Sequence, residues 1–201
     1  MASTHDYESD PRNKDIQIYI NGEYFHRAVA KVSVLDSGFL LGDGVWEGIR
    51  LHKGHLLYLD EHFDRLFNGA AALAMDIDRS REELAQVLKD TLHKNEMDSD
   101  VHIRLIISRG LKNTPYQHPK VIVGKPTLVI IPEYKKASEK VKRTGITLAT
   151  VETRRDHYVQ DPKINSLSKH NCIAACIEAE HLGADEGLML DPHGYVATCN
   201  S

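Results

Sequence analysis

The chain has 201 residues, of which 41% are hydrophobic and 27% charged, the composition of an ordinary soluble globular protein. Its formal net charge of −4 gives no electrostatic reason to expect a nucleic acid or an anionic membrane surface as a partner. No apolar run approaches the roughly 20 residues that a membrane-spanning helix needs, so we expect no membrane partner.

The first part of the chain predicts a small domain over residues 15–134, preceded by a polar, flexible N-terminus over residues 1–14. Alternating isoleucines between Ile16 and Ile20 predict a strand that enters a type I′ hairpin at Asn21-Gly22. Apolar alternation or continuous apolar runs predict further strands at residues 32–35, 45–52, 55–58, 101–107 and 127–132.

Two helices are expected between these strands. Asp60 is predicted to cap the first, whose apolar stripe leaves Arg65 off the buried side. Ser80 and Glu83 have the spacing of a capping box, which predicts the start of the second.

The second part of the chain predicts a linker over residues 135–145 and the start of a larger domain over residues 146–201. It would contain strands at 146–151, 186–190 and 195–199 and a helix over 168–182. A second domain this short would form a poor hydrophobic core on its own. We therefore expect that the chain is truncated, or that partner proteins complete this domain.

Cysteine and histidine usage gives no sign of a disulfide framework or a metal site. Cys172, Cys176 and Cys199 are an odd number, and we expect them to be small buried hydrophobic residues in a reducing cytoplasm. The twelve histidines are scattered and show no metal-ligand spacing, so no bound metal is expected.

Three motifs together carry a resemblance: the glycine-rich stretch Ser37–Arg50, the segment Leu59–Leu66, and the run from Gly183 to Val196. They resemble the class IV (fold-type IV) aminotransferases that depend on pyridoxal phosphate, which include the branched-chain and D-amino-acid enzymes. The resemblance implies an α+β or α/β fold with a small N-terminal α+β domain and a larger C-terminal domain, incomplete here. It also implies pyridoxal 5′-phosphate as the cofactor.

Two arginines and a tryptophan are candidates for ligand binding. A guanidinium near a helix start, expected beside the turn Gly42–Gly44, suits a phosphate, and Arg65 matches the family's phosphate-binding arginine. Arg109, where a strand opens into a loop, matches the arginine that reads the substrate carboxylate in D-amino-acid transaminases. Trp46 matches an aromatic wall of the family's substrate pocket. Each residue also has a purely structural alternative: Arg65 as a solvated helix arginine, Arg109 in a surface ion pair, and Trp46 as a core tryptophan.

The position that corresponds to the family's Schiff-base lysine holds Asn165, which cannot form that bond. Lys169 is four residues on and would point the same way if the following helix began early. Lys163 is two residues back and would share a face of an extended strand. We favour Lys169 as the catalytic amine, keep Lys163 as the second candidate, and leave open that both are surface lysines.

Thr198 occupies the place of the glutamate that binds the pyridine nitrogen in the family, and Ser201 matches a position near the phosphate. A hydroxyl can hydrogen-bond the ring nitrogen but does not keep it protonated, which weakens the ring as an electron sink.

The resemblance therefore implies a cytoplasmic, homodimeric aminotransferase that moves an amino group between an amino acid, of branched-chain type, and a 2-oxo acid. Two alternatives stay open from the sequence. One is a lyase similar to aminodeoxychorismate lyase. The other is a catalytically silent homologue that acts as a binding or scaffold subunit, which the replacements at Asn165 and Thr198 favour.

Overall fold

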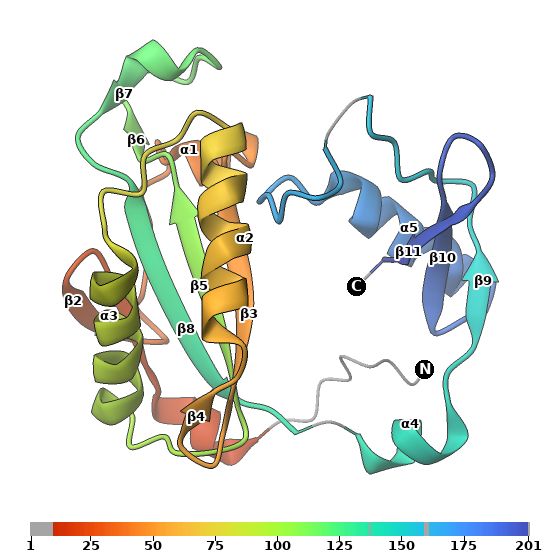
Figure 1. Ribbon diagram of the computed structural model, residues 1–201, viewed down its shortest axis with the longest axis horizontal. Helices are drawn as coiled ribbons and strands as arrows, with labels where there is room; N and C mark the ends of the chain where they lie inside the picture. The colour runs from red at the N-terminus through yellow and green to blue at the C-terminus, as the bar shows by residue number, and fades with distance from the viewer. Residues whose placement is uncertain (1–9, 137, 159–160, 201) are drawn as a thin grey trace. The chain divides into compact units, whose positions relative to one another are not determined.

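The computed structural model describes residues 10–136, 138–158 and 161–200, which form two compact units (Figure 1). The N-terminal unit contains residues 10–135 together with the short segment 164–168. The C-terminal unit contains the other described residues, those from 136 to 163 and from 169 to 200. The domain and linker boundaries expected from composition stay predictions, and they do not anticipate that residues 164–168 pack with the first unit.

A six-stranded sheet with every neighbouring pair antiparallel forms the N-terminal unit, in the order β2-β1-β8-β5-β3-β4. Its strands are β1 Gln17–Ile20, β2 Glu23–His26, β3 Gly44–His52, β4 His55–Leu56, β5 Val101–Ser108 and β8 Thr127–Tyr134. A separate ribbon pairs β6 Leu111–Lys112 with β7 Ile122–Val123. The remaining short elements are α1 Ser37–Leu41 and the 3₁₀ helices Pro11–Asp15 and Pro119–Val121.

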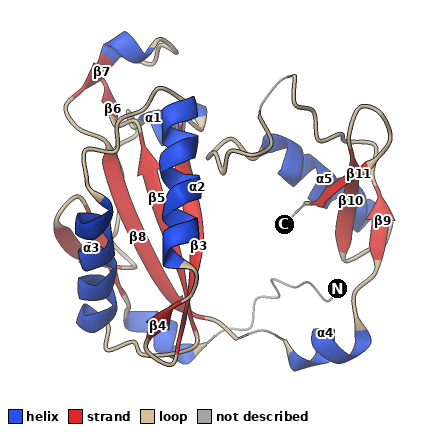
Figure 2. Ribbon diagram, viewed as in Figure 1, coloured by secondary structure: helices blue, strands red, loops and turns tan. Residues whose placement is uncertain are grey.

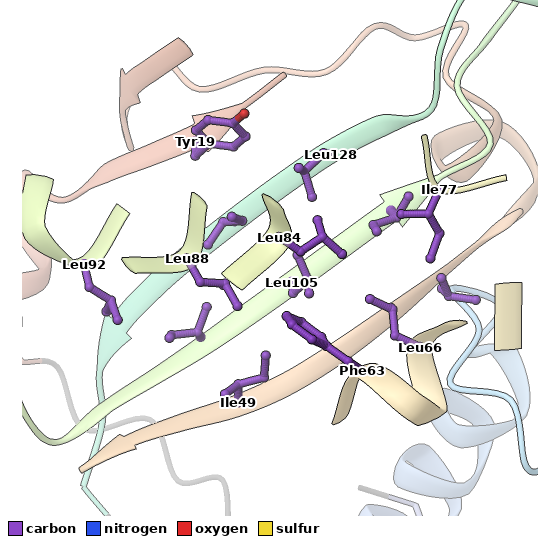
Figure 3. Close-up of a cluster of buried hydrophobic side chains, with 14 of the residues drawn as sticks. Tyr19, Ile49, Phe63, Leu66, Ile77, Leu84, Leu88, Leu92, Leu105 and Leu128 are labelled. Carbon is purple, nitrogen blue, oxygen red and sulfur yellow. The ribbon is translucent and has the colours of Figure 1, made fainter. Parts of the chain in front are cut away.

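Helices α2 (Leu59–Ala72) and α3 (Arg81–Lys94) cover one face of this sheet (Figure 2). Their apolar sides meet the alternate residues of β3 and β5 in one hydrophobic core. In Figure 3, Phe63 of α2 and Leu84 of α3 lie over the part of the sheet that carries Ile49 and Leu105. The core therefore fixes α2 against β3, and those two elements carry the motifs singled out above.

Several local predictions are confirmed. Asn21 and Gly22 both have positive φ, 49° and 104°, as a type I′ hairpin between β1 and β2 requires. Ser80 accepts from the backbone of Glu83 while the Glu83 side chain accepts from the backbone of Ser80, so the capping box at the start of α3 is present.

Other local predictions are wrong. Residues 32–35 form no strand: Val32 and Val34 are exposed, and the segment leads into α1. The residue that caps α2 is Tyr58, with φ 52°, and Asp60 lies inside the first turn, where a carboxylate favours the helix dipole. Within the N-terminal segment expected to be flexible, the Asn13 side chain bonds the backbone of Tyr134 at 2.8 and 2.9 Å, and the flexibility of residues 1–14 stays a prediction. Residues 1–9 lie outside the described residues.

The C-terminal unit contains a three-stranded sheet in the order β11-β10-β9. Its elements are α4 Glu139–Thr144, β9 Leu148–Thr150, α5 His170–His181, β10 Glu186–Leu190 and β11 Val196–Cys199. A small core joins Ala175 and Ala179 of α5 to Met189 of β10 and to Val151, which directly follows β9. In neither unit do the described residues include a helix long and apolar enough to cross a lipid bilayer.

Candidate functional site

Glu47, in the middle of β3, is the centre of a charged cluster in the N-terminal unit. Its side chain is fully buried, and it accepts from Arg65 Nε at 2.7 Å, from Arg65 Nη2 at 2.5 Å and from His62 Nδ1 at 2.7 Å. An ionised carboxylate only accepts hydrogen bonds, so His62 carries its proton on Nδ1. These three donors stabilise the buried negative charge. Burial of an ionised carboxylate without such partners would cost too much free energy.

Arg65 is half exposed, with 49% of its side chain accessible, and it is held against Glu47 through the Nε and Nη2 edge of its guanidinium. The hydrogen bonds to Glu47 raise the pKa of Arg65 further above its ordinary value, against the opposing effect of burial. We expected Arg65 beside the turn Gly42–Gly44, but its hydrogen-bonded partner is Glu47. The arginine that contacts that turn is a different one.

The segment 164–168 lies along the first residues of β3, although it is more than a hundred residues away in sequence. The backbone N–H of Trp46 donates to Asn165 O at 2.9 Å, that of Leu167 donates to Gly44 O at 3.0 Å, and Val45 bridges Ser166. The Asn165 carboxamide donates to Glu47 Oε1 at 3.4 Å. Asn165, which the resemblance places at the position of the family's lysine, therefore joins the Glu47 cluster.

The two candidate lysines belong to the C-terminal unit. Lys169 is the N-cap residue of α5, which begins at His170, and residues 164–168 are not helical. The helical turn that would have aligned Lys169 with Asn165 is therefore absent. Lys163 is exposed, and its backbone N–H donates to Asp161. Neither lysine is assigned as the catalytic amine by this geometry, so both remain predictions.

Arg109 clamps the glycine-rich turn. Its guanidinium donates to both carboxylate oxygens of Asp43, at 2.8 and 3.0 Å, and to the backbone carbonyls of Leu73 and Ala74. Burial of Asp43 works against its ionisation, but the hydrogen bonds from Arg109 and Ser37 outweigh it and hold the pKa of Asp43 below its ordinary value. With its donors engaged in this way, Arg109 has a structural role, and its prediction as a carboxylate reader gains no support.

Trp46 and Arg104 share the face of the sheet that lies away from α2 and α3. The Arg104 guanidinium lies over the Trp46 ring, with its central carbon 4.1 Å from the ring centroid. Within the described part of the chain, Arg104 makes no ion pair, and loss of water around it lowers its pKa. Sequence reasoning missed Arg104; the available signal was a charged residue between the apolar residues Ile103 and Leu105 in a predicted strand.

Thr198 lies in β11, opposite Met189 of β10, and is half buried. Ser201 lies outside the described residues. The roles predicted for these two residues at the cofactor ring and phosphate are therefore still predictions.

Comparison with known proteins gives consistent matches. A sequence model of the family described as amino-transferase class IV matches residues 44–201. The chain is 39% identical, over 95% of its length, to the branched-chain-amino-acid aminotransferase-like protein 1 of Arabidopsis thaliana, and covers 34% of that protein. It is 31% identical, over 69% of its length, to the D-alanine aminotransferase of Staphylococcus haemolyticus, and covers 49% of it.

Among solved structures, the T.th. branched-chain amino acid aminotransferase complexed with N-(5′-phosphopyridoxyl)-L-glutamate superposes with a TM-score of 0.82 at 29% identity. The alignment covers 94% of the present chain and 62% of that structure. The chain thus spans less than two thirds of the length of the proteins that it matches here.

Proposed function

Because the chain belongs to the class IV aminotransferase family, we propose that it is a pyridoxal-phosphate-dependent aminotransferase. It would move an amino group between an amino acid, of branched-chain type, and a 2-oxo acid. The observation that carries this proposal is the Arg65 guanidinium, held in place by buried Glu47 and still half open to solvent. The similar solved structure holds a phosphopyridoxyl derivative of glutamate, which supports the same class of cofactor.

The donor set around Arg65 fits the phosphate group of that cofactor. One edge of the guanidinium is used by Glu47, and its Nη1 has no acceptor among the residues that the structure describes. Two N–H groups on that nitrogen are suited to phosphate oxygens, and a charge-assisted bond of this kind is about twice as strong as a neutral one. Ser201 is proposed as a further phosphate contact and Thr198 as the contact of the ring nitrogen.

When bound, pyridoxal phosphate supplies an electron-withdrawing ring that makes the α-proton of an amino acid acidic. The chain must then supply an amine that moves this proton. Asn165 cannot do so, because a carboxamide is neither basic nor nucleophilic. We propose Lys169 for this role, with Lys163 as the alternative.

For the substrate carboxylate, the geometry favours Arg104 over the predicted Arg109. Arg109 is bonded on several sides, whereas Arg104 makes no ion pair with the described residues and has the Trp46 ring beside its guanidinium. An arginine fork can bind a carboxylate through two hydrogen bonds. Trp46 would then form an apolar wall beside the bound amino acid.

The homodimer is also a proposal, and an apolar surface on the N-terminal unit supports it. Val34, Phe39 and Leu41 are 70%, 68% and 46% exposed, and they lie in one short stretch around α1. Phe39 also lines a groove of about 430 Å³ whose other walls include Ile106 and Val129 of the sheet. Exposed apolar surface of this kind is typical of a contact with a second copy. A cytoplasmic location, supported by three free thiols, completes the proposal.

The test is an amino-transfer assay with saturating pyridoxal phosphate, 2-oxoglutarate as the acceptor, and leucine, isoleucine or valine as the donor. We expect glutamate to form, and Arg65→Ala to lower the rate at subsaturating cofactor by about tenfold or more, the loss of one charge-assisted contact. Arg81→Ala is the matched control, because Arg81 is an exposed arginine that pairs with Asp64 on the neighbouring helix α2. A wild-type protein that forms no glutamate with any of the three donors would contradict the proposal.

A further inference from the structure

The Glu47 carboxylate has four nitrogen partners, two on each oxygen. Oε1 has Arg65 Nε and Asn165 Nδ2, and Oε2 has Arg65 Nη2 and His62 Nδ1. Each oxygen of a carboxylate accepts about two hydrogen bonds, so Glu47 is saturated by the chain itself. A saturated, fully buried carboxylate has no capacity left for a ligand, and its effect on one must act through a neighbour.

That neighbour is Arg65, which has the longest and most exposed side chain of the cluster. An arginine on the exposed side of a helix normally samples several rotamers, and fixing such a side chain on binding costs free energy. Here two parallel hydrogen bonds to Glu47 already fix the plane of the guanidinium. The bidentate arrangement also determines which edge faces the carboxylate, so Nη1 is left on the other side.

We propose that Glu47 is a positioning residue: it fixes the Arg65 guanidinium before ligand binding, so that the Nη1 side is presented to a phosphate group. The proposal rests on the function proposed above, in which Arg65 contacts the cofactor phosphate. It goes further because it attributes part of the affinity of Arg65 for the phosphate to Glu47, which itself contacts neither cofactor nor substrate.

Glu47 also has an electrostatic effect on phosphate binding, and it opposes the effect of orienting Arg65. The direction of the change in phosphate affinity therefore tests the proposal. The carboxylate neutralises part of the arginine charge, so its removal leaves a more positive site that attracts an anion more strongly. If charge alone matters, Glu47→Gln binds phosphate more tightly than the wild type. If prior orientation matters more, the same variant binds phosphate more weakly.

The experiment is isothermal titration calorimetry of the full chain with pyridoxal 5′-phosphate and, separately, with inorganic phosphate. Glu47→Gln keeps the side-chain shape without the charge, and Glu47→Asp keeps the charge but is too short to maintain both bonds. We expect both variants to bind each probe roughly threefold to tenfold more weakly, the cost of ordering one long side chain on binding. Asp64→Asn, which removes the exposed partner of Arg81, is the matched control and is expected to bind as the wild type does.

A spectroscopic measurement separates orientation from a general loss of structure. The Nε–H resonance of Arg65 in a ¹⁵N–¹H spectrum is expected to be protected from exchange in the wild type and to lose protection in both Glu47 variants. Thermal unfolding identifies a temperature at which each protein is folded, and if Glu47→Gln does not fold, Glu47→Asp decides alone. Wild-type affinity in a folded Glu47 variant overturns the inference and leaves the proposed function intact. Absence of phosphate binding by the wild type overturns both.

Discussion

The Asn165 carboxamide donates to the Glu47 carboxylate across 3.4 Å, and 118 residues separate the two in sequence. This contact joins the position that the family resemblance gives to the catalytic lysine with the carboxylate that holds Arg65. Asn165 provides a hydrogen-bond donor beside Glu47, the carboxylate that also accepts from Arg65.

Asn165→Asp should destabilise the N-terminal unit, because it places a second carboxylate beside buried Glu47. We expect the free energy of unfolding in urea to fall by about 1–3 kcal/mol, the cost of a buried group that loses its partner. The repulsion raises the pKa of the new carboxyl, so the loss should be largest at neutral pH and should shrink as that carboxyl protonates. Asn165→Ala removes the bond without adding charge and should cost less. Equal losses in the two variants would contradict the prediction that a carboxylate at position 165 is repelled by Glu47.

Asp43→Asn should reveal a pH-dependent contribution of the Arg109 clamp. The folded protein holds the pKa of Asp43 below its ordinary value, so the ionised carboxyl contributes stability above the unfolded-state pKa of about 3.9. That contribution is lost as the pH falls through the lower, folded-state pKa. The difference in free energy of unfolding between wild type and variant should therefore be constant near neutrality and should shrink below about pH 4. A difference in free energy of unfolding that grows as the pH falls would contradict this role of the Asp43 carboxylate.

Gly44→Ala should disrupt the start of β3. A Cβ at Gly44 would lie 2.5 Å from the carbonyl oxygen of Ile107 and 2.8 Å from Cα of Ser108, both backbone atoms of the paired strand. We expect a loss of about 2 kcal/mol or more in the free energy of unfolding, as for other overpacked sites.

The matched control for Gly44→Ala is Gly69→Ala in α2. There the added Cβ would meet Ile164 and Val45 at 3.4 and 3.5 Å, ordinary contact distances. Alanine is favoured over glycine inside a helix by about 1 kcal/mol, so this variant should be neutral or more stable. Comparable losses for the two glycines would contradict the close approach of β3 and β5.

Phe39→Asp should disrupt the proposed homodimer without unfolding the protein. Phe39 is 68% exposed in the single chain, so a charge there costs little within one copy and is unfavourable only in an apolar contact. Light scattering during size-exclusion chromatography should give a dimer mass for the wild type and a monomer mass for the variant, with similar unfolding midpoints. A wild type that is monomeric over the accessible concentration range would contradict the proposed dimer.

Local features of the fold were predictable from sequence because neighbouring residues determine them. The Asn21-Gly22 turn and the Ser80–Glu83 capping box depend on backbone conformations and bonds within a few residues. The predicted strand at 32–35 was wrong because alternation of Val32 and Val34 does not reveal whether a partner strand is available.

The candidate site was predictable only in part, because it depends on long-range contacts. Sequence reasoning selected Arg65, but its partner Glu47 and the return of Asn165 to β3 are tertiary contacts with no local signal. The selection of Arg109 and the omission of Arg104 show the same limitation. An arginine at a strand end and an arginine inside a strand look alike until the partners of each are known.

The most direct test of the proposed function is borohydride reduction of the protein after incubation with pyridoxal phosphate, followed by peptide mapping. We expect an absorbance band from the bound cofactor, loss of that band on reduction, and reduced cofactor attached to Lys169 or Lys163. A reduced protein with no labelled lysine, or a label spread evenly over surface lysines, would contradict the assignment of an aminotransferase with a displaced catalytic lysine.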